Sequence, residues 1–223
     1  MAFPRRVGSE TSKTRDRLLD CVERLMLEEG YAAVTYRAVA AAAGVTSGLV
    51  QYYFPTLDDV FVAAIRRRSQ QNVDRLTNAL SAQPTQPLRV LWEYSQDEAA
   101  AALTTEFLAL GNHRKSIRAE IAEVTEQVRR LQVHALESAS ITSGMAIGDL
   151  SPNALLFLLT GIPKLICLEE GVGVATAHAE VMTAFEQYLD TVEPSDQLAD
   201  QPVDRPTDRK GSARSKKAAR RVS

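Results

Sequence analysis

Apolar side chains recur along most of this chain at intervals of three and four residues, the spacing of one face of an α-helix. The clearest stretch is 34–54, VTYRAVAAAAGVTSGLVQYYF, where two short apolar helices flank a glycine. Thr35, and either Thr46 or Ser47, suit the starts of these helices, because their hydroxyls accept free backbone N–H groups. Gly44 suits the turn, which needs a positive φ. The pattern predicts two steeply crossing helices, a helix-turn-helix.

The outward side of the second short helix is uncharged and consists of Ser47, Gly48, Gln51 and Tyr52. A polar, uncharged helix side is suited to enter a groove of DNA and touch the edges of bases. An ordinary pair of packed helices would show the same A-x-x-x-G spacing, since small residues are common in an alanine-rich chain. The spacing alone therefore leaves both interpretations open.

The same periodicity predicts an all-α protein, because continuous β-branched runs are missing. The predicted division is a disordered arm at 1–11, a three-helix domain at 12–56, a helical body at 57–193 and a disordered basic tail at 194–223. Residues 111 and 112, Gly-Asn, are predicted to break the body. Helices are predicted over residues 12–29, 57–80, 88–110, 113–140, 153–170 and 176–192.

The stretch 153–170 is apolar on nearly all sides, so most of its surface must be covered. In a chain of 223 residues, this favours a second subunit and predicts a homodimer. Pro163 is expected to kink this helix or to leave backbone hydrogen bonds open. The interface is predicted to include this helix and the last one, at Leu155, Leu158, Ile162, Val181, Phe185 and Tyr188.

Composition narrows the class of protein. No apolar run approaches the roughly 20 residues of a membrane span, and the N-terminus lacks a secretion segment, so no membrane partner is expected. Cys21 and Cys167 lie in apolar helical patterns and are expected to be reduced, which favours the cytoplasm. The three histidines share no ligand spacing with cysteines or carboxylates, and no nucleophile motif is evident, so we expect no metal, cofactor or catalytic residue.

Charge is distributed unevenly along the chain. Lys and Arg exceed Asp and Glu by 11 to 9 in residues 1–75 and by 8 to 2 in residues 201–223. Residues 76–200 hold 7 basic and 17 acidic side chains. A nucleic acid would therefore be attracted to the ends of the chain and repelled by its middle.

Residues 15–65 resemble the DNA-binding domain of the TetR family of bacterial repressors. The resemblance rests on EEGY at 28–31, VTYRAVA at 34–40, AGVT at 43–46, GLVQYYFP at 48–55 and LDDV at 57–60. The family usually has Tyr, His and Lys where this chain has Gln51, Tyr53 and Leu57. Two of those family residues commonly touch phosphate, so DNA contact is expected to depend more on Thr35, Arg37, Tyr52 and the N-terminal arm.

The resemblance implies a homodimeric repressor that binds double-stranded DNA and is released from an inverted-repeat operator by a small hydrophobic effector. It also implies a ligand cavity between the helices of the body. The residues expected to contact DNA are Thr35, Arg37, Thr46, Ser47, Gly48, Gln51, Tyr52 and Tyr53. The residues expected to line the cavity are Trp92, Tyr94, Phe107, His113, His134 and Phe157.

Two other interpretations stay open. An architectural DNA-binding protein would use the basic ends of the chain without any ligand. A helical enzyme or adaptor would bind no DNA at all.

Overall fold

The computed structural model describes residues 7–143 and 150–193, with side chains at 13–139 and 150–193. Every regular element in those ranges is helical, which confirms the predicted all-α class. The elements are α1 (Val7–Glu29), the 3-10 turn η1 (Tyr31–Ala33), α2 (Tyr36–Ala43), α3 (Ser47–Tyr53), α4 (Leu57–Ala82), α5 (Pro87–Ser95), α6 (Glu98–His113), α7 (Lys115–Ser143), α8 (Pro152–Glu170) and α9 (His178–Val192).

The first helix begins earlier than predicted. α1 starts at Val7, inside the segment expected to be a disordered arm. Gly8 and the neighbouring Ser and Thr residues weaken a helix without breaking it, which accounts for the difference. The rest of the predicted arm, 1–6, and the predicted tail, 194–223, lie outside the described residues.

The turn between α2 and α3 forms as the sequence predicted. The Thr35 hydroxyl accepts the N–H of Ala38 at 3.1 Å and caps α2. Gly44 has a φ of 64°, the left-handed conformation that ends α2. The Thr46 hydroxyl accepts the N–H of Leu49 at 3.3 Å and caps α3. These local bonds orient α3 relative to α2.

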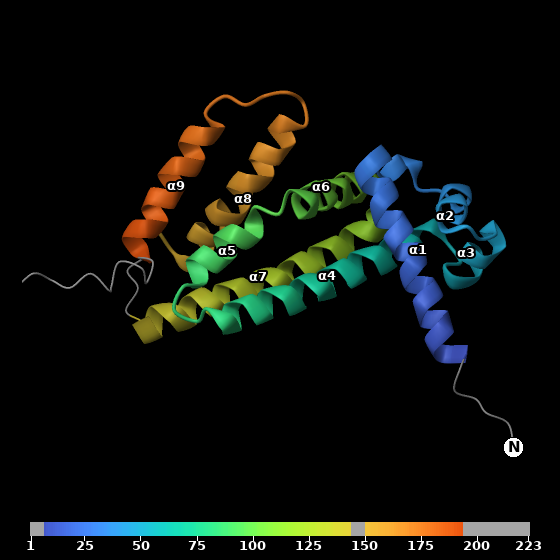
Figure 1. Ribbon diagram of the computed structural model, residues 1–223, viewed down its shortest axis with the longest axis horizontal. Helices are drawn as coiled ribbons and strands as arrows, with labels where there is room; N and C mark the ends of the chain where they lie inside the picture. The colour runs from blue at the N-terminus through green and yellow to red at the C-terminus, as the bar shows by residue number, and fades with distance from the viewer. Residues whose placement is uncertain (1–6, 144–149, 194–223) are drawn as a thin grey trace, which may run out of the picture.

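The long helices α4 and α7 run side by side along the length of the molecule (Figure 1). The head, defined as residues 7–56, lies at one end of this pair, and α8 and α9 lie toward the other end. α6 lies between them and extends to the head. Any signal from the body to the head must therefore pass along α4, α6 or α7.

The segment 88–110 forms two helices instead of one, because Asp97 caps a new helix by accepting the N–H of Ala100 at 3.0 Å. The predicted break at 111–112 is wrong. Gly111 lies within α6, where a Cβ atom would approach Cδ1 of Ile121 to 2.7 Å. The glycine allows α6 and α7 to pack closely, and the break comes at Arg114, which is extended.

Two hydrophobic cores hold the molecule together. The first includes Leu19 and Val50 of the head, and it continues into α4, into α6 through Phe107 and Leu110, and into α7 through Ile117. It therefore crosses the predicted domain boundary at residue 56. The second core joins α4 and α7 to α5, α8 and α9.

α8 is the one helix among the described residues that is long and apolar enough to cross a membrane, judged by length and composition alone. Its mean hydropathy reaches 1.3, although charged and polar residues interrupt its apolar sequence. Leu155, Leu156 and Leu159 pack into the second core. Only 22% of the apolar window is buried within this chain, so most of it stays uncovered in a single chain.

Candidate nucleic-acid interface and cavity

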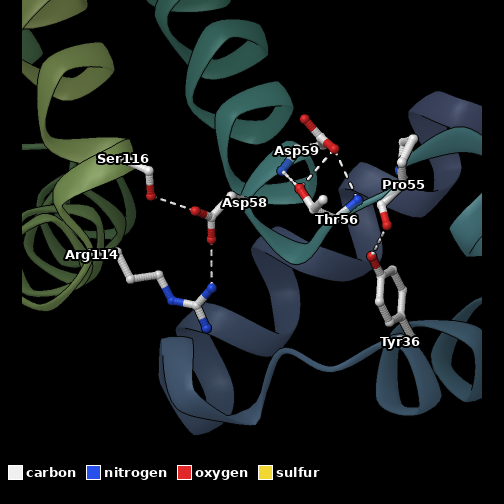
Figure 2. A network of polar contacts seen from close by, with 7 residues as sticks. All are labelled: Tyr36, Pro55, Thr56, Asp58, Asp59, Arg114 and Ser116. Atoms are coloured by element: carbon white, nitrogen blue, oxygen red, sulfur yellow. Dashed lines mark hydrogen bonds and ion pairs between the residues drawn. The ribbon is translucent and has the colours of Figure 1, made fainter.

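Side chains outside the turn fix α2 and α3 in place. The Tyr36 hydroxyl lies 2.9 Å from the carbonyl oxygen of Pro55 and 3.1 Å from that of Phe54, just beyond the end of α3 (Figure 2). The guanidinium of Arg17, on α1, donates to the carbonyl of Ala43 at the end of α2. Both short helices are thus anchored to the rest of the head.

The exposed side of α3 consists of Gly48, Gln51 and Tyr52, with Thr46 exposed just before the helix. Tyr52 leaves 75% of its surface exposed. The opposite side carries Val50, which is fully buried. An aromatic ring and an amide on one uncharged helix side can both hydrogen-bond to and stack against an external partner.

The other predicted DNA-contacting residues are partly exposed and partly packed. Thr35 and Arg37 are exposed at the start of α2. Ser47 is half-buried in the first turn of α3. Tyr53 packs against the first core, with its ring centroid 5.4 Å from that of Tyr52. Tyr53 therefore supports Tyr52 and does not stand on the exposed side.

Arg15 is a basic residue at this surface that the sequence analysis did not single out. Its guanidinium lies over the ring of Phe54, 5.3 Å from the centroid, at the end of α3. Arg15 itself is exposed. The two residues are 39 positions apart, so only the fold brings this cation to the end of α3.

A cavity of about 170 Å³ lies in the body, between α4, α6, α7 and α8 and beside the end of α5. Its apolar wall is formed by Ile65, Phe107, Leu108, Ile121, Val124 and Val128. Its charged side chains are Arg68, Asp97, Arg129 and Lys164. Its uncharged polar side chains include Asn72, Tyr94, Thr104, Gln132 and Thr160.

Two polar groups in the cavity wall are strongly affected by burial. The Tyr94 hydroxyl donates to the carbonyl of Asn72 at 3.2 Å, and burial raises the pKa of this tyrosine. The side-chain oxygen of Asn72 is buried and has no hydrogen-bond partner among the described residues. A buried acceptor without a donor is costly, so this oxygen is better satisfied when a water molecule or another hydrogen-bond donor enters the cavity.

Of the predicted cavity residues, Tyr94 and Phe107 line this space. Trp92 instead stacks on Phe185 in the second core, with 4.5 Å between ring centroids. His113 stacks on Tyr31 at the end of α6. The other two are exposed, His134 on α7 and Phe157 on α8.

The predicted interface residues are divided between residues packed inside this chain and residues exposed on its surface. Leu155 is fully buried in the second core, and Ile162, Phe185 and Tyr188 are packed against it. Leu158 and Val181 are exposed. The exposed apolar side of the body also includes Phe157, Leu165, Leu168, Val172 and Val174.

A polar contact joins the body to the head, and others join α4 to the start of α7 just beyond the head. A side-chain oxygen of Glu106, on α6, accepts the N–H of Tyr31 at 2.7 Å. Asp58, in the first turn of α4, accepts hydrogen bonds from Ser116 and, at 2.6 Å, from Arg114 (Figure 2). These two donors hold the pKa of the Asp58 carboxyl below its usual value. α6 therefore contacts the cavity through Phe107 and the head through the preceding residue, Glu106.

Residues 18–64 match the family described as bacterial regulatory proteins, tetR family. The HTH-type transcriptional regulator AcrR of Shigella flexneri is 29% identical over 132 residues, which span 57% of this chain and 61% of that protein. The HTH-type transcriptional repressor BepR of Brucella suis biovar 1 is 25% identical over 140 residues, 59% of this chain and 65% of that protein. The match thus spans less than two thirds of the length of either relative.

Among solved structures, the multidrug binding protein EbrR complexed with imidazole superposes with a TM-score of 0.54 at 26% identity. The superposition covers 78% of this chain and 93% of that chain. The likeness therefore extends through both the head and the body.

Proposed function

We propose that this chain, whose residues 18–64 match the tetR family of bacterial regulatory proteins, is a transcriptional regulator that binds double-stranded DNA through α3. The observation that carries the proposal is the exposed, uncharged side of α3, with Gly48, Gln51 and Tyr52, on a turn fixed by Tyr36 and Arg17. A rigid helix of this kind fits the major groove, where uncharged polar side chains can distinguish bases.

The regulator acts as a homodimer. The exposed apolar side of α8 and α9 supports this, because monomeric soluble proteins rarely expose large contiguous apolar patches. A two-fold dimer presents two α3 helices to successive major grooves, about 34 Å apart. The expected operator is accordingly an inverted repeat. Such a protein works on chromosomal DNA in the cytoplasm.

A small molecule in the body cavity releases the repressor from its operator. The position of the cavity supports this, since α6 forms part of its wall and also contacts the head through Glu106. EbrR, the structural relative, is a multidrug binding protein, and BepR is a repressor. A ligand that displaces α6 would shift Tyr31 and η1, and with them the start of α2. This coupling requires that the ligand bind the two arrangements with different affinities.

Footprinting tests the proposal directly. The purified full-length protein is incubated with the DNA upstream of its own coding sequence and of the neighbouring genes, and protection from nuclease is mapped. We expect one short protected inverted repeat that survives excess random DNA. Even protection along every fragment would instead favour the architectural DNA-binding protein, and no protection at low salt would favour a helical adaptor.

A further inference from the structure

The cavity wall carries more positive than negative charge. Arg68, Arg129 and Lys164 line it together with a single acidic side chain, Asp97. Asp97 already accepts the N–H of Ala100 at 3.0 Å and lies 3.4 Å from the guanidinium of Arg75, outside the cavity lining. Its negative charge is therefore largely offset, and the cationic side chains of the wall are left in excess.

Lys164 is the cation with the least compensation. It lies on α8 directly after Pro163, and no acidic side chain forms an ion pair with it among the described residues. Burial, and then the positive charge of Arg129 in the same wall, lower the pKa of Lys164. Arg129 has only a distant partner, Glu126 at 3.9 Å, and lies 5.8 Å from the ring centroid of Phe157. An uncompensated cation in a cavity wall is stabilised when an anion enters.

The rest of the wall suits a ring or a short hydrocarbon chain. Phe107, Ile121 and Val124 line the cavity from α6 and α7. The volume of about 170 Å³ is small for a ligand site. A cavity of about 150 Å³ in another protein holds benzene, so one aromatic ring fills much of this space and leaves the polar end for its substituent.

We propose that this cavity binds a small aromatic or short-chain carboxylate, with the acid group at Lys164 and Arg129 and the apolar part against Phe107, Ile121 and Val124. The inference rests on the proposed function, in that the cavity is taken to be the effector site. It differs from the small hydrophobic effector expected from the sequence, because only the fold brings these cations together in the cavity wall. A neutral ligand would leave Lys164 unpaired, and a cationic ligand would be repelled by it.

Isothermal titration calorimetry with three probes of similar size tests the proposal on the full-length protein without DNA. Phenylacetate carries the acid, phenylacetamide is its neutral analogue, and phenethylamine is a cation. We expect phenylacetate to bind about tenfold or more tightly than phenylacetamide, because a charge-assisted hydrogen bond is stronger than a neutral one. Phenethylamine should not bind. Equal binding of all three, or no binding of phenylacetate at millimolar concentration, would overturn the proposal.

Variants assign the preference to one side chain. Lys164→Met should reduce phenylacetate affinity about tenfold and change phenylacetamide affinity by less than about twofold. Lys164→Arg keeps the charge and should keep the preference, while Lys115→Met removes an exposed lysine outside the cavity and should change neither affinity. Unchanged phenylacetate affinity in a folded Lys164→Met protein would refute the assignment.

The footprint separates this inference from the proposed function. If phenylacetate binds through Lys164 but leaves the protected repeat unchanged, the ligand class stands and the regulatory role of the cavity fails. If no repeat is protected, the DNA proposal fails while the calorimetric result keeps its meaning.

Discussion

Gly48 is a residue that the fold itself does not require. A Cβ atom built on it would meet nothing within 4 Å, and it lies in the first turn of α3 with an ordinary helical backbone. Glycine inside a helix costs roughly 0.5–1 kcal/mol relative to alanine. A destabilising residue on the exposed side of α3 indicates that something outside the chain approaches the backbone there.

Gly48→Ala should therefore separate stability from function. The free energy of unfolding in urea should rise by up to about 1 kcal/mol. Affinity for operator DNA, measured by fluorescence anisotropy, should fall, because the added methyl group keeps α3 away from the groove. A variant that is both more stable and equally tight on DNA would contradict this role of Gly48.

Gln51 belongs to the same exposed side and carries the amide that can read a base. Gln51→Ala should weaken binding to the operator by about 1–3 kcal/mol and leave binding to random DNA nearly unchanged. Electrophoretic mobility shifts on the two DNAs provide the comparison. Equal losses on both would show that Gln51 contacts only the backbone of DNA.

Asp58 makes a contribution to stability that depends on pH. Its pKa is lowered in the folded protein by hydrogen bonds from Ser116 and Arg114, whereas an unfolded chain has a value of about 3.9. The contribution is therefore fully present above the unfolded pKa and is lost as pH falls through the folded pKa. Its size is modest because the carboxylate is about one-third exposed, at 36%.

Asp58→Asn should accordingly lower the melting temperature at pH 7, and the difference from the unmodified protein should shrink below about pH 4. Thermal unfolding followed by circular dichroism at a series of pH values measures it. Asp74→Asn, an exposed position on the same helix, is the control and should lower the melting temperature at pH 7 by less. A difference in melting temperature that grows as the pH falls would contradict a lowered pKa of Asp58 in the folded protein.

A hydrogen bond joins α5 to α8 at the point where Pro163 interrupts the backbone hydrogen bonds of α8. Pro163 has no N–H, so the carbonyl of Leu159 lacks its usual partner within the helix. The Ser95 hydroxyl, at the end of α5, lies 3.1 Å from that carbonyl and 2.7 Å from the carbonyl of Trp92. With one proton to donate, it can serve only one of the two at a time.

Ser95→Ala should cost about 1–3 kcal/mol of unfolding free energy, because it leaves part-buried carbonyls without a donor. Ser81→Ala is a matched control, since the Ser81 hydroxyl bonds to Thr77 at the exposed end of α4. Urea unfolding of both variants tests the pair. Equal losses of unfolding free energy in the two variants would mean that the hydrogen bond from Ser95 to α8 adds no more stability than the exposed bond of Ser81.

Local signals predicted the head well. Thr35, Gly44 and Thr46 each act within about four residues of their own position, and the hydrogen-bonding and backbone pattern of a cap can be read from such a short window. The position of Gly111 was misinterpreted, because its role depends on Ile121 in the next helix.

The cavity was the part that sequence could not locate. Bulky residues such as Trp92 and Phe157 were expected there. In the folded chain Trp92 is buried in the second core, and Phe157 is exposed on α8. Lys164 and Arg129 carry no pattern that marks them as cavity residues. They come together only because α7 and α8 pack against each other beside the same cavity.

For the assembled molecule, the exposed apolar side of α8 makes a prediction about subunits. Leu165 is 57% exposed, and Leu27, on α1, is 44% exposed but lies in the head. Leu165→Asp should convert a dimer to monomers, because a charge cannot be buried there without a partner, whereas Leu27→Asp should remain dimeric. Light scattering at micromolar concentration distinguishes them. A monomeric unmodified protein would contradict the proposed dimer.

Substitution of Phe185 should have a different effect from substitution of Leu165. Its ring stacks on Trp92 within one chain, so Phe185→Asp should unfold the second core instead of merely separating subunits. Loss of near-ultraviolet circular dichroism from Trp92 would accompany that unfolding. A folded monomer would instead place Phe185 at the interface alone.

The first core also limits how the head can be exchanged for the head of another protein. Phe107, Leu110, Ile117 and Ile121 reach into the head from α6 and α7. A chimaera cut at residue 56, with a foreign head on this body, would bring these four side chains against partners of the wrong shape. DNA specificity can therefore be transplanted only together with the corner between α6 and α7, so the unit of exchange is discontinuous in sequence.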